Sequence, residues 1–218
     1  GKGDSAALSG GGVTMKKRGL IICLAAIICL SGIGGRIWYI NMDREDTVTE
    51  IYPMGEMVSF EDDYFYNSDE LRDQYEVCAN SAVVMPVKEY LDSVGLTEEE
   101  VWPDGNSLVT DILSVEVTIR NNNTDVENDN QYFDLFNTNI MSQGDNYQME
   151  HDILWAMYPQ LDQSTFGFRI APGTEYTITL PFRVLNWQRT NSEKIKQKEN
   201  YLLLSMYPVK KMIRIIPE

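Results

Sequence analysis

The stretch LSVEVTIR, residues 113–120, decides the fold class of this 218-residue chain. Its apolar side chains occupy every second position: Leu113, Val115, Val117 and Ile119. Successive side chains of a β-strand point to opposite faces, so this alternation predicts a half-buried antiparallel strand. The chain must therefore build a sheet with one face against a core.

The same alternation returns in residues 176–184, YTITLPFRV. A shorter run precedes it at 166–170, and the two are separated by the turn sequence Ala-Pro-Gly-Thr at 171–174. Proline and glycine are the residues that such a turn requires. These features predict a hairpin between 166–170 and 176–184.

Residues 201–207, YLLLSMY, are apolar at nearly every position, which is typical of a central strand covered on both faces. Pro208 interrupts this run, and residues 209–216 resume it as a last strand. Cations on an outer strand prevent pairing with other chains. We therefore expect 209–216 to be an edge strand, guarded by Lys210, Lys211 and Arg214.

Helices are expected only in the connections between strands. Residues 87–94 end at Gly95, Thr97 opens a short capped turn, and residues 150–158 stop at Pro159. Earlier strands are expected at 56–60, 64–66, 74–84 and 132–140. Strands about ten residues apart favour a mainly β fold, an antiparallel β-sandwich with short helices in its connections, over an α/β fold; the domain would span residues 51–218.

The N-terminal region has a different character. Residues 1–14 are rich in glycine and serine and are expected to be a disordered tail or a start artefact, and 15–18 form a basic segment. Residues 19–40 carry a long apolar run. As a helix they would extend about 33 Å, enough to cross a bilayer core of about 30 Å. We expect one transmembrane anchor there, followed by a stalk at 41–50.

Cleavage as a signal peptide is the alternative for this segment, although an Ala-x-Ala site is absent. The basic residues before the helix place the N-terminus in the cytoplasm and the acidic bulk outside. From Glu45 onward there are twelve basic and thirty-one acidic residues, a net charge of −19. The expected location is therefore the cell membrane, single-pass, with an extracellular C-terminal domain.

Charge and composition exclude several classes of function. The whole chain has a net charge of −15, which argues against nucleic-acid binding. Three cysteines and one histidine are too few for a zinc finger or a disulfide scaffold. Cys23 and Cys29 fall within the apolar segment, and Cys78 is expected to be a small strand residue.

Catalysis is not expected. His151 is the one histidine base, at the start of a predicted helix, and a Gly-x-Ser-x-Gly elbow is absent. Carboxylates are plentiful, so residue type alone leaves a glycosidase open. We assign no catalytic residue, no cofactor-binding residue, no metal ligand and no cofactor.

Two weaker patterns remain open. Asp125, Glu127 and Asp129 alternate like a calcium loop but lack the glycine and the final glutamate of an EF-hand, so an acidic turn is the alternative. The sequence also offers three aromatic side chains for either a sugar- or peptide-binding platform or the core: Trp102, Trp155 and Trp187.

Several segments resemble a known family. They include Arg36–Tyr39, Ile51–Glu56, Asn80–Ala82, Tyr158–Leu161 and Ser205–Ile213. The resemblance covers about residues 15–218 and is to an uncharacterised family of single-pass anchored extracytoplasmic proteins of Gram-positive Firmicutes, itself a domain of unknown function. The chain is also distantly similar to telokin-type, immunoglobulin-like domains. The resemblance implies a sandwich at the membrane and transfers no catalytic residue.

Together these patterns predict a membrane-anchored, non-catalytic interaction module of the bacterial cell envelope. Its partners would be the membrane, through the N-terminal helix, and a membrane or envelope protein; the oligomeric state stays open. The alternatives are a cation- or peptide-sensing domain and a hydrolase.

Overall fold

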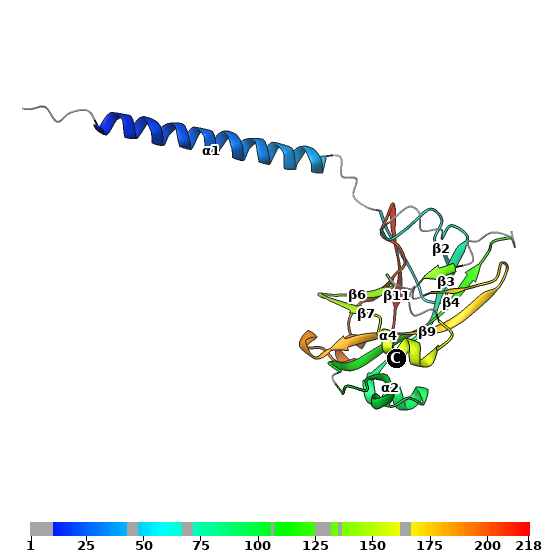
Figure 1. Ribbon diagram of the computed structural model, residues 1–218. Coiled ribbons are helices and arrows are strands. Elements are labelled where there is room, and N and C mark those ends of the chain that lie inside the picture. Colours follow the sequence, from blue (N-terminus) through cyan, green and yellow to red (C-terminus); the bar gives the residue numbers. More distant parts are fainter. Residues whose placement is uncertain are drawn as a thin grey trace, which may run out of the picture. The chain divides into compact units, whose positions relative to one another are not determined.

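The computed structural model describes residues 11–42, 48–66, 72–105, 107–124, 132–134, 137–161 and 167–218. Two compact units make up the chain, Gly1–Asp46 and Thr47–Glu218. The first contains helix α1 (Gly11–Met42), and the second contains the described strands and the shorter helices (Figure 1).

Helix α1 is apolar on all sides over much of its length. Its segment Ile22–Tyr39 has a mean hydropathy of 1.7, and none of that segment is buried within the protein. These residues extend about 27 Å, close to the thickness of a bilayer core. The helix fits a membrane anchor or a signal sequence. It also includes 11–14, which the sequence assigns to a tail, whereas 1–10 lie outside the described residues.

The second unit is a β-sandwich. Its strands are β1 (Val48–Tyr52), β2 (Val58–Ser59), β3 (Tyr75–Pro86), β4 (Val109–Asn121), β5 (Tyr132–Asp134), β6 (Asn139–Ser142), β7 (Asp145–Gln148), β8 (Gly167–Arg169), β9 (Glu175–Leu185), β10 (Asn200–Leu203) and β11 (Val209–Ile215). One sheet has the order β1-β11-β10-β6-β7 and the other β2-β3-β4-β9, while β5 and β8 form a separate pair. The predicted mainly-β sandwich is confirmed.

The helices lie in the connections, as predicted. They are α2 (Val87–Val94), α3 (Glu98–Val101), α4 (His151–Met157), α5 (Ser192–Lys196) and the 3-10 helix η1 (Asn186–Gln188). Gly95 ends α2 with φ 74°, a left-handed conformation that glycine adopts without strain. The Thr97 side chain accepts the Glu100 N–H and the Glu100 side chain accepts the Thr97 N–H, which completes the capping box of α3.

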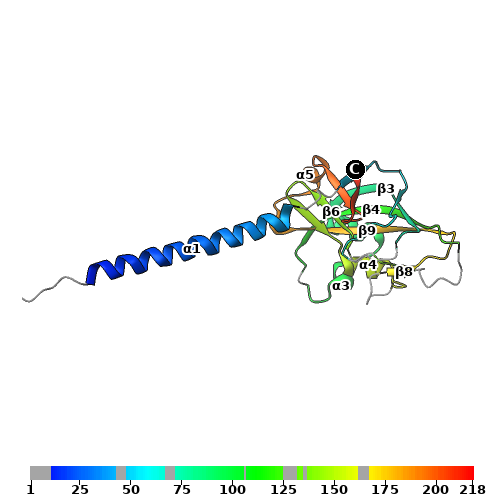
Figure 2. The ribbon, with the colours of Figure 1, turned by 90° about the horizontal axis from the view of Figure 1, so that it is seen from above.

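The alternation of 113–120 produces the core. Its four apolar side chains are buried between the sheets together with residues of β9, β10 and β11. The opposite face of the β4 sheet is covered at one end by helices: Ile112 packs in a second cluster with Leu91 of α2, Val101 of α3 and Ile153 of α4. Figure 2 shows α3 and α4 on the same side of this sheet.

Strand β11 is not an edge strand, so the prediction from its three cations was wrong. Strand β1 pairs with it in parallel, from Val48 opposite Val209 to Tyr52 opposite Ile213. Lys211 is only 2% exposed and cannot guard an edge. The sequence did not predict β1, because Val48, Thr49 and Glu50 fall within the polar segment 41–50 that was expected to be a stalk. This parallel pair is also an exception to the predicted antiparallel order.

The predicted hairpin between 166–170 and 176–184 is also wrong, although its turn forms. Strand β8 pairs with β5, whereas β9 pairs with β4. The turn is fastened to the end of β4, since the Asn121 N–H donates to Thr174 O and the Gly173 N–H donates to Asn121 O. This attachment carries the chain across the end of β4, so the two flanking segments enter different sheets.

The remaining strand predictions are met in part. Strands β2 and β3 fall at 56–60 and 74–84, and β10 is the central strand of its sheet. Residues 64–66 contribute only an isolated bridge between Tyr64 and Tyr207. The region 132–140 contains two strands, β5 and the start of β6, instead of one.

Asn121 offers a test of the crossing. Its Nδ2 donates to Ile170 O at 2.8 Å and to Tyr75 Oη at 3.3 Å, and its Oδ1 accepts the Asn123 N–H at 2.9 Å. Because Asn121→Ala leaves buried polar groups without partners, we expect it to lower the free energy of unfolding by about 2–4 kcal/mol.

Chemical denaturation of the full chain in detergent, followed by tryptophan fluorescence, measures this loss. Asn122→Ala is the matched control, since Asn122 is exposed. Equal effects of the two substitutions would contradict the role of Asn121.

Candidate binding groove

A groove opens beside α3 and α4, where β7 and β9 also end. It has a volume of about 360 Å³ and is lined by Trp102, Ser107, Leu108, Val109, Gln148, Glu150, Asp152, Arg183, Leu185 and Trp187. Trp102 also borders a neighbouring hollow with Glu98 and Glu99. Concave surfaces that combine apolar side chains with a few polar groups are the usual binding sites of proteins.

The two tryptophans of the groove are held by helix ends. Trp102 follows α3, and its backbone N–H donates to Glu98 O at 2.7 Å. Trp187 lies in η1 and is 61% exposed. Gln188 holds this turn, because its Oε1 accepts the Leu185 N–H at 2.7 Å and its Nε2 donates to Asn146 O at 3.3 Å.

The structure therefore brings together two of the three tryptophans that the sequence singled out. Trp155 is the exception, since its ring stacks on His151 within α4, with ring centroids 5.8 Å apart. The sequence alone did not pair Trp102 with Trp187, because they are 85 positions apart in the chain. Between them the chain leaves the sheet at the end of β4, contributes β6 and β7 to the other sheet, and returns at β9.

The lining of the groove includes one buried carboxylate. Glu150 is only 4% exposed, and Arg183 Nη1 donates to its Oε2 at 3.4 Å. Arg183 Nη2 donates to Gln148 Oε1 at 2.8 Å. Burial raises the pKa of Glu150, and the Arg183 charge opposes that rise. Sequence analysis missed this pair; a lone glutamate before a helix and an arginine on the polar face of a strand carried no distinguishing signal.

His151 is half-buried at the start of α4. Burial lowers its pKa, and the nearby Arg183 charge lowers it further, so the ring is neutral near pH 7. It borders a second hollow of about 350 Å³ with Tyr66, Asn146 and Gln148. The sequence placed His151 at a helix start, which is where it lies.

The described residues were compared with the requirements of a metal site and of a reactive thiol. No three His, Cys, Asp or Glu side chains within that part of the chain are grouped so that they could hold a metal ion. The suggested calcium ligands Asp125, Glu127 and Asp129 lie outside the described residues. Cys78 is buried, and burial raises the pKa of its thiol, which disfavours a reactive thiolate.

A family model named Domain of unknown function (DUF5028) matches residues 49–211. The chain belongs to the DUF5028 family. The DUF5028 region includes both tryptophans of the groove and the sandwich from Thr49 of β1 to Lys211 of β11. This agrees with the resemblance to a domain of unknown function.

Known proteins add little beyond the family. None of the curated proteins matches the chain. The solved structures include a crystal structure of an uncharacterized beta-sandwich protein from Clostridium difficile 630, with 12% sequence identity and a TM-score of 0.39. That similarity covers 79% of this chain and 97% of the other.

Glu150 makes the stability of the DUF5028 domain depend on pH. Because its pKa is raised above the ordinary value of 4.5, the folded state binds its proton more tightly than the unfolded chain does. The stabilisation that protonated Glu150 gives to the folded state is therefore lost as the pH rises from 4.5 through the raised pKa. We expect Glu150→Gln to gain stability relative to the parent chain between about pH 4 and pH 7.

Denaturation of both chains over this pH range measures the difference. Asp152→Asn, which removes an exposed carboxylate of the same groove, controls for the loss of one negative charge. A stability difference between Glu150→Gln and the parent that is constant with pH would contradict the assignment.

Proposed function

We propose that this DUF5028 protein is a membrane-anchored, non-catalytic interaction module of the bacterial cell envelope. The observation that carries the proposal is the division into an apolar helix with no buried side chains over Ile22–Tyr39 and a separate compact sandwich. A sandwich held at the bilayer by one helix is suited to contact a neighbouring membrane or envelope protein.

The charge distribution supports an outward-facing sandwich. Lys16, Lys17 and Arg18 precede the apolar segment, and positive residues beside a membrane helix favour the cytoplasmic side. The net charge of −19 after Glu45 repels anionic lipid, so the domain would stand away from the membrane surface.

The groove suggests the chemistry of the partner. Trp187 and Leu108 are exposed and apolar, and Asp152 presents an exposed carboxylate in the same lining. Glu98 and Glu99 present exposed carboxylates in the neighbouring hollow that Trp102 borders. Arg183, the basic side chain of the lining, is already paired with Glu150. Tryptophan faces attract cations, so a basic segment of an envelope protein fits both the rings and the charge.

A non-catalytic role agrees with the reactive groups present. The Cys78 thiol is buried with a raised pKa, and His151 is half-buried beside the Arg183 charge. We infer binding, with neither a cofactor nor a covalent step in the groove.

Membrane attachment has a direct test. The full chain, expressed in a Gram-positive host, should stay in the membrane fraction after alkaline extraction, and protease added to whole cells should digest the sandwich. A variant lacking residues 19–40 should lose membrane retention. Release of a soluble product beginning near Gly35 would indicate a cleaved signal, and protection from protease would place the domain in the cytoplasm.

The groove has a separate test. We expect a short lysine- and arginine-rich peptide to change the tryptophan fluorescence of the full chain in detergent, and Trp187→Ala to weaken its binding at least about tenfold. Ile216→Ala is the matched control, because Ile216 is exposed and apolar but does not line the groove. Equal binding of an acidic peptide of the same length would contradict the proposed partner chemistry.

A further inference from the structure

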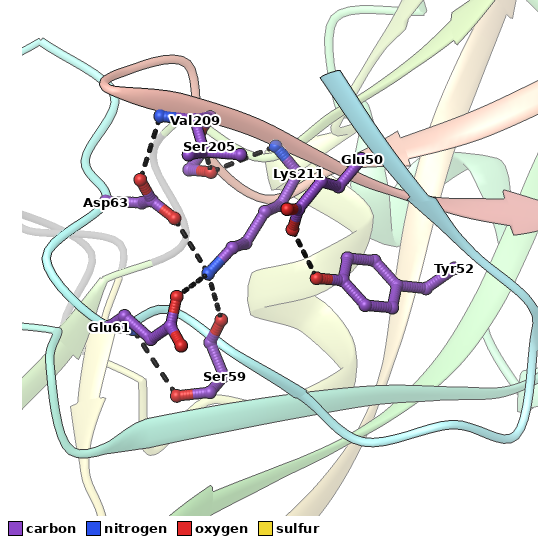
Figure 3. Close-up of polar contacts among 8 residues, drawn as sticks. All are labelled: Glu50, Tyr52, Ser59, Glu61, Asp63, Ser205, Val209 and Lys211. Atoms are coloured by element: carbon purple, nitrogen blue, oxygen red, sulfur yellow. Dashed lines mark hydrogen bonds and ion pairs between the residues drawn. The ribbon is translucent and has the colours of Figure 1, made fainter. Parts of the chain in front are cut away.

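The side chain of Lys211 points from β11 toward a cluster of three oxygen atoms, from Ser59, Glu61 and Asp63 (Figure 3). Its Nζ lies 2.9 Å from Ser59 O, 2.7 Å from Glu61 Oε2 and 2.8 Å from Asp63 Oδ2. Lys211 and Asp63 are 2% and 3% exposed. A primary amine and a carboxyl group are therefore held in contact and shielded from water.

The two oxygens of Asp63 have different surroundings. Oδ1 accepts the Val209 N–H at 2.9 Å. Oδ2 is buried and accepts no hydrogen bond of good geometry, even though Nζ is 2.8 Å away. Oδ2, which has no well-directed donor, is thus the oxygen beside the amine. Oδ1 already accepts the Val209 N–H, as the carbonyl oxygen of an amide would.

Glu61 is the third member of this group and the one in contact with solvent. Its side chain is 73% exposed, and its backbone adopts φ 52°, a left-handed conformation that is unfavourable for a residue with a side chain. That conformation accompanies the contact of its carboxylate with Nζ. Glu61 can therefore carry protons between the buried pair and water.

We propose that Lys211 and Asp63 condense to an intramolecular amide bond, with Glu61 as the proton carrier. Burial disfavours the ammonium group of Lys211, but the carboxylates of Asp63 and Glu61 hold its pKa above the ordinary value, so the ion pair is the resting form. The reactive form arises when a proton passes from the ammonium group to Asp63, which leaves a neutral amine and a carboxylic acid. Nζ attacks Cγ, and the Val209 N–H stabilises the negative charge that develops on Oδ1.

The Cγ–Oδ2 bond then breaks. Glu61 takes a proton from the attacking nitrogen and delivers one to Oδ2, which leaves as water. The products are one amide and one water molecule, so neither an oxidant nor a second substrate is required. Oδ1 keeps its hydrogen bond from Val209 as the amide carbonyl, and the remaining N–H faces Ser59 O.

The bond would join the last strand to the segment that follows β2, across 148 residues of sequence. A link over so long a loop restricts the unfolded chain strongly. In an anchored domain it would also fix the final strand near the beginning of the sandwich, so that force applied to the chain would be carried covalently.

Intact-mass measurement of the purified full chain tests the proposal. We expect a mass lower than that of the sequence by one water molecule, and a cross-linked pair of proteolytic peptides that contain Asp63 and Lys211. Lys211→Arg and Asp63→Ala should show the full sequence mass, and Glu61→Gln should slow the loss of water. Lys210→Arg is the matched control and should keep the cross-link.

The parent chain is incubated at neutral pH until its mass no longer changes. A final mass equal to that of the full sequence, with no loss of water, would overturn the proposal. So would a loss of water that persists in Lys211→Arg. Because the parent chain gives the deciding result, the test holds even if a variant fails to fold.

Discussion

The buried amine of Lys211 is the constraint on which the N-terminal half of the sandwich depends. A cation removed from water is costly unless oxygen atoms surround it. Ser59, Glu61 and Asp63 supply those atoms, and Asp63 also accepts the Val209 N–H. The segment after β2 is thereby fastened to β11.

Strand β1 completes this arrangement on the other side of β11. Glu50 lies opposite Lys211 in the parallel register, and the Tyr52 hydroxyl donates to Glu50 at 2.5 Å. This hydrogen bond and the Glu50 charge raise the pKa of Tyr52 to about 12. The first and last strands of the sandwich thus pair with each other, so β1 and the segment after β2 both hold β11.

Local patterns accounted for much of the scaffold but little of the groove. Alternation in 113–120 and 176–184 identified β4 and β9, and Gly95 and Thr97 marked helix ends, because each signal acts within a few residues. Trp102 lies at the C-terminal end of α3, and Trp187 lies within η1. Only the long pairing of β4 with β9 makes these two turns neighbours, so their meeting had no local signal.

By itself, the sequence determined the apolar N-terminal helix, the class of sandwich and the position of the short helices, since these follow from periodicity, length and capping chemistry. Tertiary structure alone decided that β11 is interior, that the turn at 171–174 separates two sheets, and that Lys211 is buried. A cation on a strand is compatible with an exposed edge or with a buried site surrounded by carboxylates. The choice depends on oxygen atoms about 150 residues away in the chain, which only the folded arrangement brings within reach.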